Sequence, residues 1–167
     1  YIYNLYGYEL DVDQFYQVAL GVKNLESRDK EGITSLDKVE VYAWPLFDAK
    51  QMLVMRRSFE LGLSLEQVCF FANPDFDAHQ MHQIALGFLH GLDVEDVKLY
   101  AMPHVDDYHM SQIRSLLEEE YPTVEELACY LEVYFNIPLE AALANINMDP
   151  NDTIVDEAIE MIQKDPT

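Results

Sequence analysis

Three stretches of the sequence can be set under one another without a gap: YAWPLFDAKQM at residues 42–52, FANPDFDAHQM at 71–81 and YAMPHVDDYHM at 100–110. Each step is 29 residues long, and Gly62 and Gly91 keep the same spacing. Five residues therefore recur at constant offsets: an aromatic residue, alanine, proline, aspartate and methionine. A fixed period of roughly 20 to 50 residues is typical of proteins built from repeated structural units, so we expect a repeat architecture.

The residues of the second stretch fit the start of a helix. Asp77 can cap the free backbone N–H groups of the first turn, and Gln80 can reach back to the cap residue, as in a capping box. Phe76 and Met81 then pack on each other across the cap as a hydrophobic staple. The glycine that follows, Gly91, suits a helix end where the backbone adopts a positive φ.

A second, shorter helix is predicted directly after each glycine. Leu92, Asp93, Asp96 and Val97 repeat the pattern of cap and staple, and the helix should end near Tyr100. Each repeat is then a longer helix, a tight turn, a short helix and a proline-containing corner. The predicted fold class is all-α, with tandem helical hairpins of 29-residue period packed into a short, solenoid-like single domain. The domain covers residues 1–167, with repeats at about 8–41, 42–70, 71–99 and 100–121 and divergent C-terminal hairpins at 122–167.

The first repeat is a degraded copy with an insertion. Its residues 10–21 match residues 76–87, and an insertion of eight residues restores the register by Val39. We expect the insertion to lie in the polar stretch 23–32, as an exposed loop.

Composition favours a folded chain in a reducing compartment. Half of the 167 residues are hydrophobic and 12% are aromatic, which excludes a disordered chain. No apolar run reaches the ~18 residues of a membrane helix, and no signal-peptide pattern is present, so we expect a cytoplasmic protein. Cys69 and Cys129 lie far apart in apolar surroundings, and we expect both to be small buried hydrophobic residues.

The net charge of −21 is the extreme feature, and it is unevenly distributed. Residues 1–57 hold nine acids and seven bases, whereas residues 58–167 hold 22 acids and three bases. Direct nucleic-acid binding requires the opposite sign. A dense acidic surface can instead compete for the basic channel of a nucleic-acid-handling protein. The residues predicted to contact such a partner are the densest acids that lack neighbouring bases: Glu118, Glu119, Glu120, Glu125, Glu126 and Glu132. The alternative is a surface that serves only solubility.

No catalytic, cofactor or metal site is predicted. His79 and His82 lie three residues apart, but zinc requires three or four convergent ligands, and no nucleophile motif or glycine-rich phosphate loop is present. The acids at 149–160 imitate a calcium loop, yet Ile154 stands where the loop requires glycine. We therefore expect a non-enzymatic protein.

The repeat resembles one found in proteins of Gram-positive gut bacteria and their mobile elements. The resemblance is carried by Phe76-Asp77-x-x-Gln80-Met81-x-x-Ile84, by Gly91-Leu92-Asp93-Val94 and by Tyr100-Ala101-x-Pro103. Such proteins usually have arginine after the Ile84 position; Arg56 and Arg114 match it, whereas Ala85 departs. The resemblance covers about residues 8–117. It implies an inhibitor of host defence, such as an anti-CRISPR protein that blocks DNA binding by a guide-loaded Cas nuclease, and it implies no site residue.

A second functional hypothesis is a helical-repeat adaptor. Such a protein binds a peptide or a partner helix in a groove of the array. Exposed apolar side chains along one face, such as Leu53, Val54 or Phe70, would distinguish it from the acidic inhibitor.

Overall fold

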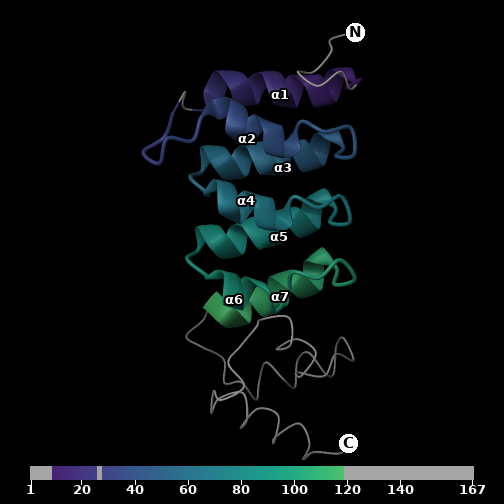
Figure 1. Cartoon of the computed structure of the whole chain (residues 1–167). Coiled ribbons are helices and arrows are strands. Elements are labelled where there is room, and N and C mark those ends of the chain that lie inside the picture. The colour runs from purple at the N-terminus through teal and green to yellow at the C-terminus, as the bar shows by residue number, and fades with distance from the viewer. Residues whose placement is uncertain (1–8, 26–27, 119–167) are drawn as a thin grey trace, which may run out of the picture. The chain divides into compact units, whose positions relative to one another are not determined.

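The computed structural model describes residues 9–25 and 28–118, and within them the chain is helical. The described residues fall into two compact units that divide between Leu89 and His90. The first unit contains helices α1 (Val12–Asn24), α2 (Ser35–Tyr42), α3 (Ala49–Glu60), α4 (Leu65–Phe71) and α5 (Ala78–Leu89) (Figure 1). The second contains α6 (Val94–Val97) and α7 (Asp107–Glu118). The described part has no strand, and an isolated β-bridge joins Arg28 to Thr34. The all-α prediction is confirmed for these residues.

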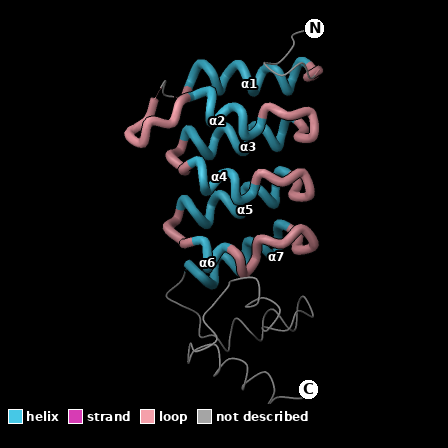
Figure 2. Tube along the Cα trace, viewed as in Figure 1, coloured by secondary structure: helices cyan, strands magenta, loops and turns pink. Residues whose placement is uncertain are grey.

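Within the first unit, long and short helices alternate along the chain. The long helices α1, α3 and α5 follow one another in space, and the short helices α2 and α4 lie between them (Figures 1 and 2). Helix α3 packs against all four of the others. The largest fully buried side chains of this unit are Tyr42, Phe71, Met52, Met55, Met81, Ile84 and Val68. The methionines of the sequence motif are therefore core residues.

Each long helix of the first unit begins with the predicted capping box. Gln51 N donates to Asp48 Oδ1 at 2.8 Å, and Asp48 N donates to Gln51 Oε1 at 2.7 Å. The pairs Asp11 with Gln14 and Asp77 with Gln80 make the same two bonds. These bonds satisfy N–H groups that the first helical turn leaves without partners. The capping prediction is thus confirmed.

The motif glutamine also has a second role that its spacing alone does not reveal. Besides capping its own helix, the Gln51 amide donates from Nε2 to the carbonyl oxygen of Phe76 at 2.7 Å. Gln14 donates in the same way to Phe47 at 2.7 Å. Both glutamines are buried. A glutamate could cap the helix but could not donate, so the second bond explains the amide at this position.

The tight turns follow the prediction as well. Gly62 has φ +102° and Gly91 has φ +93°, a backbone region that favours glycine. Helix α4 begins soon after Gly62, with Ser64 as its cap. In the second unit, the corresponding short helix α6 has only four residues.

Two predictions were wrong. Residues 23–32 do not form one exposed loop, because α1 continues to Asn24 and Leu25 is buried with 7% exposure. Cys69 is an exposed free cysteine, although its pKa is raised by partial desolvation. Helix α4 buries only one face, which Val68 and Phe71 occupy, and Cys69 follows Val68 on another side.

Several predictions lie outside the described residues. They concern the divergent hairpins at 122–167, the calcium-loop comparison at 149–160 and Cys129. The single-domain prediction for residues 1–167 stays a prediction.

Candidate binding surfaces

Most of the described acids already have structural partners. Six of them take part in helix caps: Asp11, Asp37, Asp48, Asp77, Asp93 and Asp106. Four others lie in ion pairs with lysine or arginine: Asp29, Glu60, Glu95 and Glu118. Carboxylates at helix starts are stabilised by backbone N–H groups and by the helix dipole. These ten carboxylates therefore have a structural role in the fold besides carrying charge.

Glu118 illustrates this within the second unit. Arg114 Nη1 lies 2.8 Å from each carboxylate oxygen of Glu118, and His90 Nδ1 lies 2.8 Å from Oε1. Its side chain is 21% exposed. Glu118 was predicted as an acid without a neighbouring base, and the structure instead gives it a basic partner one helical turn away. The other predicted contact residues, Glu119, Glu120, Glu125, Glu126 and Glu132, lie outside the described residues.

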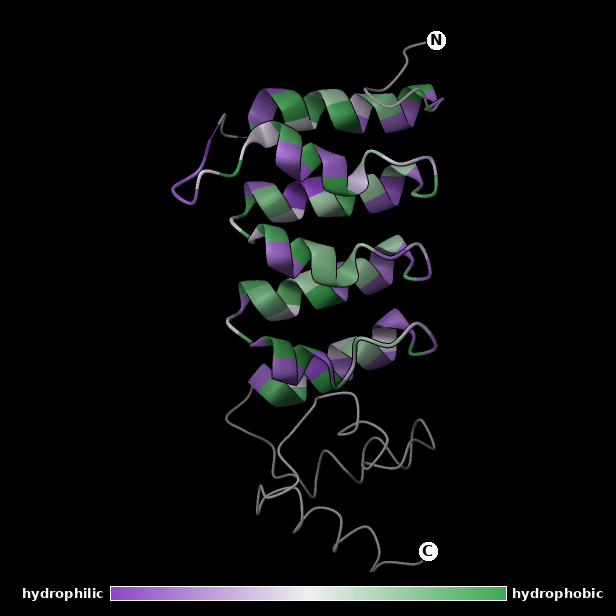
Figure 3. Cartoon of the chain, viewed as in Figure 1, coloured by the Kyte–Doolittle hydropathy of each residue, from purple (hydrophilic) through white to green (hydrophobic). Residues whose placement is uncertain are grey.

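An apolar groove of about 340 Å³ lies between the C-terminal halves of α3 and α5. Its apolar lining consists of Leu53, Val54, Leu61, Ala85, Leu86 and Leu89. Arg57, Ser58, Glu60 and His82 lie at the same groove. Leu53 of α3 is 41% exposed, and Leu61, which directly follows the last residue of α3, is 65% exposed. Figure 3 shows the apolar colouring of the C-terminal half of α5.

The contact between α1 and α3 is polar at the position that corresponds to the groove. There, Arg56 Nε donates to Gln17 Oε1 at 2.9 Å, and Arg56 Nη1 forms an ion pair with Glu60. Arg56 is only 4% exposed. We call Gln17, Arg56 and Glu60 the polar triad.

Each member of the polar triad has an apolar counterpart between α3 and α5. Aligning the helix caps places Val54 of α3 at the position of Gln17 of α1. One period of 29 residues then places Ala85 at the position of Arg56, and Leu89 at that of Glu60. All three counterparts line the groove. An Arg–Glu pair recurs in α7 as Arg114 and Glu118, whereas α5 carries Ala85 and Leu89 at the same two positions.

Two of the three predicted adaptor residues line the groove, and the third does not. Leu53 and Val54 line the groove. Phe70 is half-buried and contacts the Phe88 ring edge-on, with ring centroids 5.6 Å apart. Phe70 is therefore a packing residue, and the more informative residues, Ala85 and Leu89, were missed. Their signal in the sequence is the departure of Ala85 from the arginine that its counterparts carry.

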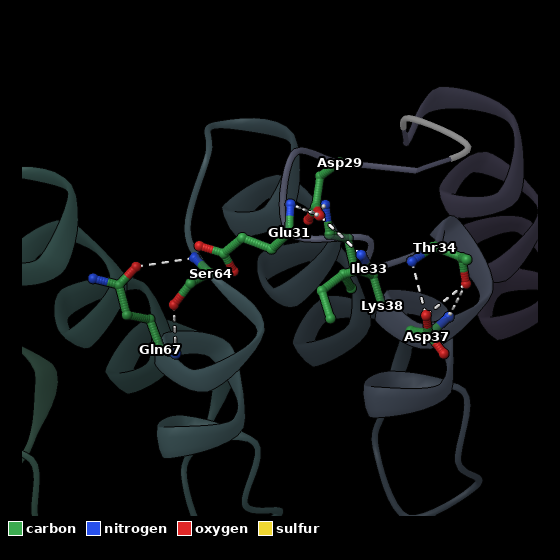
Figure 4. Close-up of polar contacts among 8 residues, drawn as sticks. All are labelled: Asp29, Glu31, Ile33, Thr34, Asp37, Lys38, Ser64 and Gln67. Carbon is green, nitrogen blue, oxygen red and sulfur yellow. Dashed lines mark hydrogen bonds and ion pairs between the residues drawn. The ribbon is translucent and has the colours of Figure 1, made fainter.

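A second pocket, of about 610 Å³, lies beneath the loop that follows α1. Two of its charged groups form an ion pair, since Lys38 Nζ lies 3.0 Å from Asp29 Oδ2 (Figure 4). The hydrogen bond from Lys38, together with backbone N–H donors, lowers the pKa of Asp29 below its usual range. Nearby, Thr34 with Asp37 and Ser64 with Gln67 cap α2 and α4. The polar groups of this pocket thus hold the loop and helix starts in place.

In residues 9–25 and 28–118, no three His, Cys, Asp or Glu side chains converge so that they could hold a metal ion. His79 and His82 are both exposed on α5. None of the helices in this same part of the chain is both long and apolar enough to cross a membrane.

Comparisons with protein-family models, with curated proteins and with solved structures found no match to this chain.

Proposed function

We propose that this chain is a non-catalytic, cytoplasmic protein-interaction module, built as a tandem array of helical hairpins, that binds a partner polypeptide in the groove between α3 and α5. The observation that supports the proposal is the joint replacement of the polar triad by Val54, Ala85 and Leu89. Two helices can pack at this position with a buried ion pair, as α1 and α3 do. The apolar version leaves a groove lined by leucines that are open to solvent.

The joint exchange is informative because single exchanges are costly. Removing one member of a buried ion pair leaves an unpaired charge and costs about 3–5 kcal/mol. Replacing all members by apolar residues is close to neutral for folding. The fold can therefore accept either version, and the apolar version adds a surface suited to binding. Exposed apolar patches rimmed by polar residues are typical of protein–protein contact sites.

The groove suits one or two apolar side chains of a partner helix. Its lining runs over residues 53–61, in α3 and at its C-cap, and over residues 82–89 of α5. Helices recognised in such grooves present apolar residues at i, i+3 or i+4 and i+7. Arg57 and Glu60, which lie 3.6 Å apart at Nη1 and Oε2, offer both signs of charge at the rim. Binding driven by this groove should persist at high salt, since apolar contacts are not screened.

The test uses a displayed library of random peptides selected on the wild-type chain. The groove variant is Val54→Gln with Ala85→Arg and Leu89→Glu, which places the whole polar triad between α3 and α5. This variant should fold, because the same three residues are accommodated between α1 and α3. We expect selected peptides to share apolar residues at helical spacing and to bind the groove variant more than about tenfold more weakly.

The matched control is Leu36→Glu, which adds a charge at an exposed leucine of α2 outside the groove. Selected peptides should bind this variant as they bind the wild type. The proposal is wrong if the peptides bind the wild type and the groove variant equally, or if selection yields no peptide that prefers the wild type.

The charge of the chain favours a second candidate, an acidic inhibitor of a nucleic-acid-handling enzyme. Residues 58–167 carry a net charge of −19, and the predicted contact acids at 119–132 contribute to it. Such a surface would bind the basic channel of the enzyme, for example a guide-loaded Cas nuclease, as an anti-CRISPR protein does. This binding should weaken as salt increases.

Adding the chain to guide-loaded nucleases with target DNA, over a range of salt, tests this candidate. Inhibition that disappears when Glu119, Glu120, Glu125, Glu126 and Glu132 are changed to glutamine would support it. Full DNA binding and cleavage with several nuclease types at every salt concentration would exclude it.

A further inference from the structure

The two helices that line the groove differ in charge from the rest of the chain. Helices α3 and α5 together have three lysine or arginine residues and one carboxylate, whereas the whole chain has ten and 31. Complementary charge selects one partner over another. We propose that the segment bound in the groove is an acidic amphipathic helix. This inference rests on the proposed function and adds to it the sign of the partner's charge.

The accessible charge at the groove is positive. The lining includes one arginine and one carboxylate, Arg57 and Glu60. The Arg57 side chain is 65% exposed, whereas that of Glu60 is 16% exposed. Glu60 is also engaged within the fold, because its Oε1 forms an ion pair with the buried Arg56. A partner in the groove can therefore reach the guanidinium of Arg57 more easily than the carboxylate of Glu60.

Lys50 continues this positive charge towards the start of α3. With about 100° and 1.5 Å per residue, Lys50 lies within about 20° of Arg57 around the helix axis and about 10 Å from it along the axis. Leu53 and Val54 lie between the two along the helix, within about 60° of Arg57 on opposite sides. Both cations are exposed. This stripe of α3 thus places the apolar residues of the groove between two accessible cations.

A partner helix aligned with α3 meets the apolar residues and the cations together. Its apolar side chains at i, i+3 or i+4 and i+7 occupy the groove. Carboxylates beside them, about seven residues apart, then lie opposite Lys50 and Arg57, since seven residues span the same distance on both helices. Helix α5 does not oppose this arrangement, because it contains no aspartate or glutamate.

The net charge of −21 acts against an acidic partner, but mainly over distances that salt screens. At physiological ionic strength the Debye length is about 8 Å, so exposed charges farther away have little effect on a carboxylate that contacts Arg57. One exposed ion pair changes affinity by up to about fivefold. Replacing two such pairs by two like-charge contacts should therefore change affinity by about tenfold.

The probe is a displayed library of helical peptides with leucine fixed at i, i+4 and i+7 and with alanine, glutamine, glutamate or lysine elsewhere. It is selected on the full wild-type chain and on the groove variant Val54→Gln, Ala85→Arg and Leu89→Glu, which has the same net charge. Recovery relative to this variant removes attraction to the rest of the acidic chain. We expect glutamate to exceed lysine about tenfold at one or two positions at about 0.15 M salt, and to lose this advantage at about 1 M salt.

Substitutions of the two cations test where the preference comes from. Arg57→Gln and Lys50→Gln should each lower the preference for glutamate, and the double variant should remove it. Lys23→Gln is the matched control, because it removes an exposed lysine of α1 that does not line the groove. It should leave the preference unchanged.

The outcomes separate this inference from the proposed function. Leucine peptides recovered from the wild type with equal glutamate and lysine, or with more lysine, would overturn the acidic partner and leave the groove as a binding site. A preference for glutamate that the double variant keeps would overturn the role of Arg57 and Lys50. Equal recovery on the wild type and on the groove variant would overturn the proposed function and this inference with it.

Discussion

The contact of α1 with α3 and the contact of α3 with α5 begin in the same way and end differently. At the start of each pair, a buried glutamine caps its own helix and donates to the corner before the next one. Towards the other end, the first contact has Gln17, Arg56 and Glu60, whereas the second has Val54, Ala85 and Leu89. The common part holds successive helices in register, and the variable part is free to differ in chemistry.

This difference separates what the fold requires from what it tolerates. The glutamine bonds satisfy backbone groups that would otherwise be buried without partners, so their loss is costly in any copy. The polar groups of the triad pair with one another, so three apolar residues can replace the triad as a whole without leaving a buried polar group unpaired. We therefore expect function at the part of the contact that differs between the two helix pairs, which in the contact of α3 with α5 is the groove.

Breaking the polar triad by one residue should have the largest effect on stability. Arg56→Ala removes the donor to Gln17 and leaves Glu60, whose side chain is 16% exposed, without its closest cation. We expect the free energy of unfolding to fall by about 3 kcal/mol, measured by urea denaturation. Arg57→Ala is the matched control, because Arg57 is 65% exposed and its pairing with Glu60 is longer. Equal losses for the two variants would show that the triad is not an internal network.

The shared glutamine should give a smaller effect that is the same in both contacts. Gln14→Ala and Gln51→Ala each remove the reciprocal cap bond and the bond to the next corner. We expect a loss of about 2 kcal/mol for each, at roughly 1 kcal/mol per hydrogen bond. Gln67→Ala is the control, since Gln67 caps α4 and has no bond to a corner; it should cost about half as much. A loss confined to one of the two long helices would contradict the equivalence of the contacts.

The sequence predicts well those features that depend on a few neighbouring residues. The capping boxes of Asp48 with Gln51 and of Asp77 with Gln80 each form within four consecutive residues. The turn at Gly62 depends on the positive φ of that one residue. The positions of the helices could therefore be predicted from spacing alone. Cys69 was misplaced because its apolar neighbours do not tell which side of a one-faced helix it takes.

The groove could not be predicted in the same way. The groove is lined by Val54 together with Ala85 and Leu89, which are far from Val54 in the sequence. The spacing of the motif does not predict which of these side chains lie close together. The departure of Ala85 from arginine was visible in the sequence. Leu89 departs from glutamate four residues later on the same helix, and only the contact between α3 and α5 shows that both side chains line a groove together with Val54. The acids at 119–132 show the opposite case, since they are conspicuous in the sequence and lie outside the described residues.

Converting the first contact into the second should have the smallest effect on stability. The triple variant Gln17→Val, Arg56→Ala and Glu60→Leu places the groove residues at the position of the polar triad. Because it removes all three polar partners together, no buried charge or amide is left alone, and we expect a change within about 1 kcal/mol of the wild type. Urea denaturation of this variant beside Arg56→Ala measures the difference directly. The triple variant should recover most of the loss caused by the single one. A triple variant as unstable as Arg56→Ala would show that the two contacts are not interchangeable, and that the apolar groove arose with other compensating changes around α5.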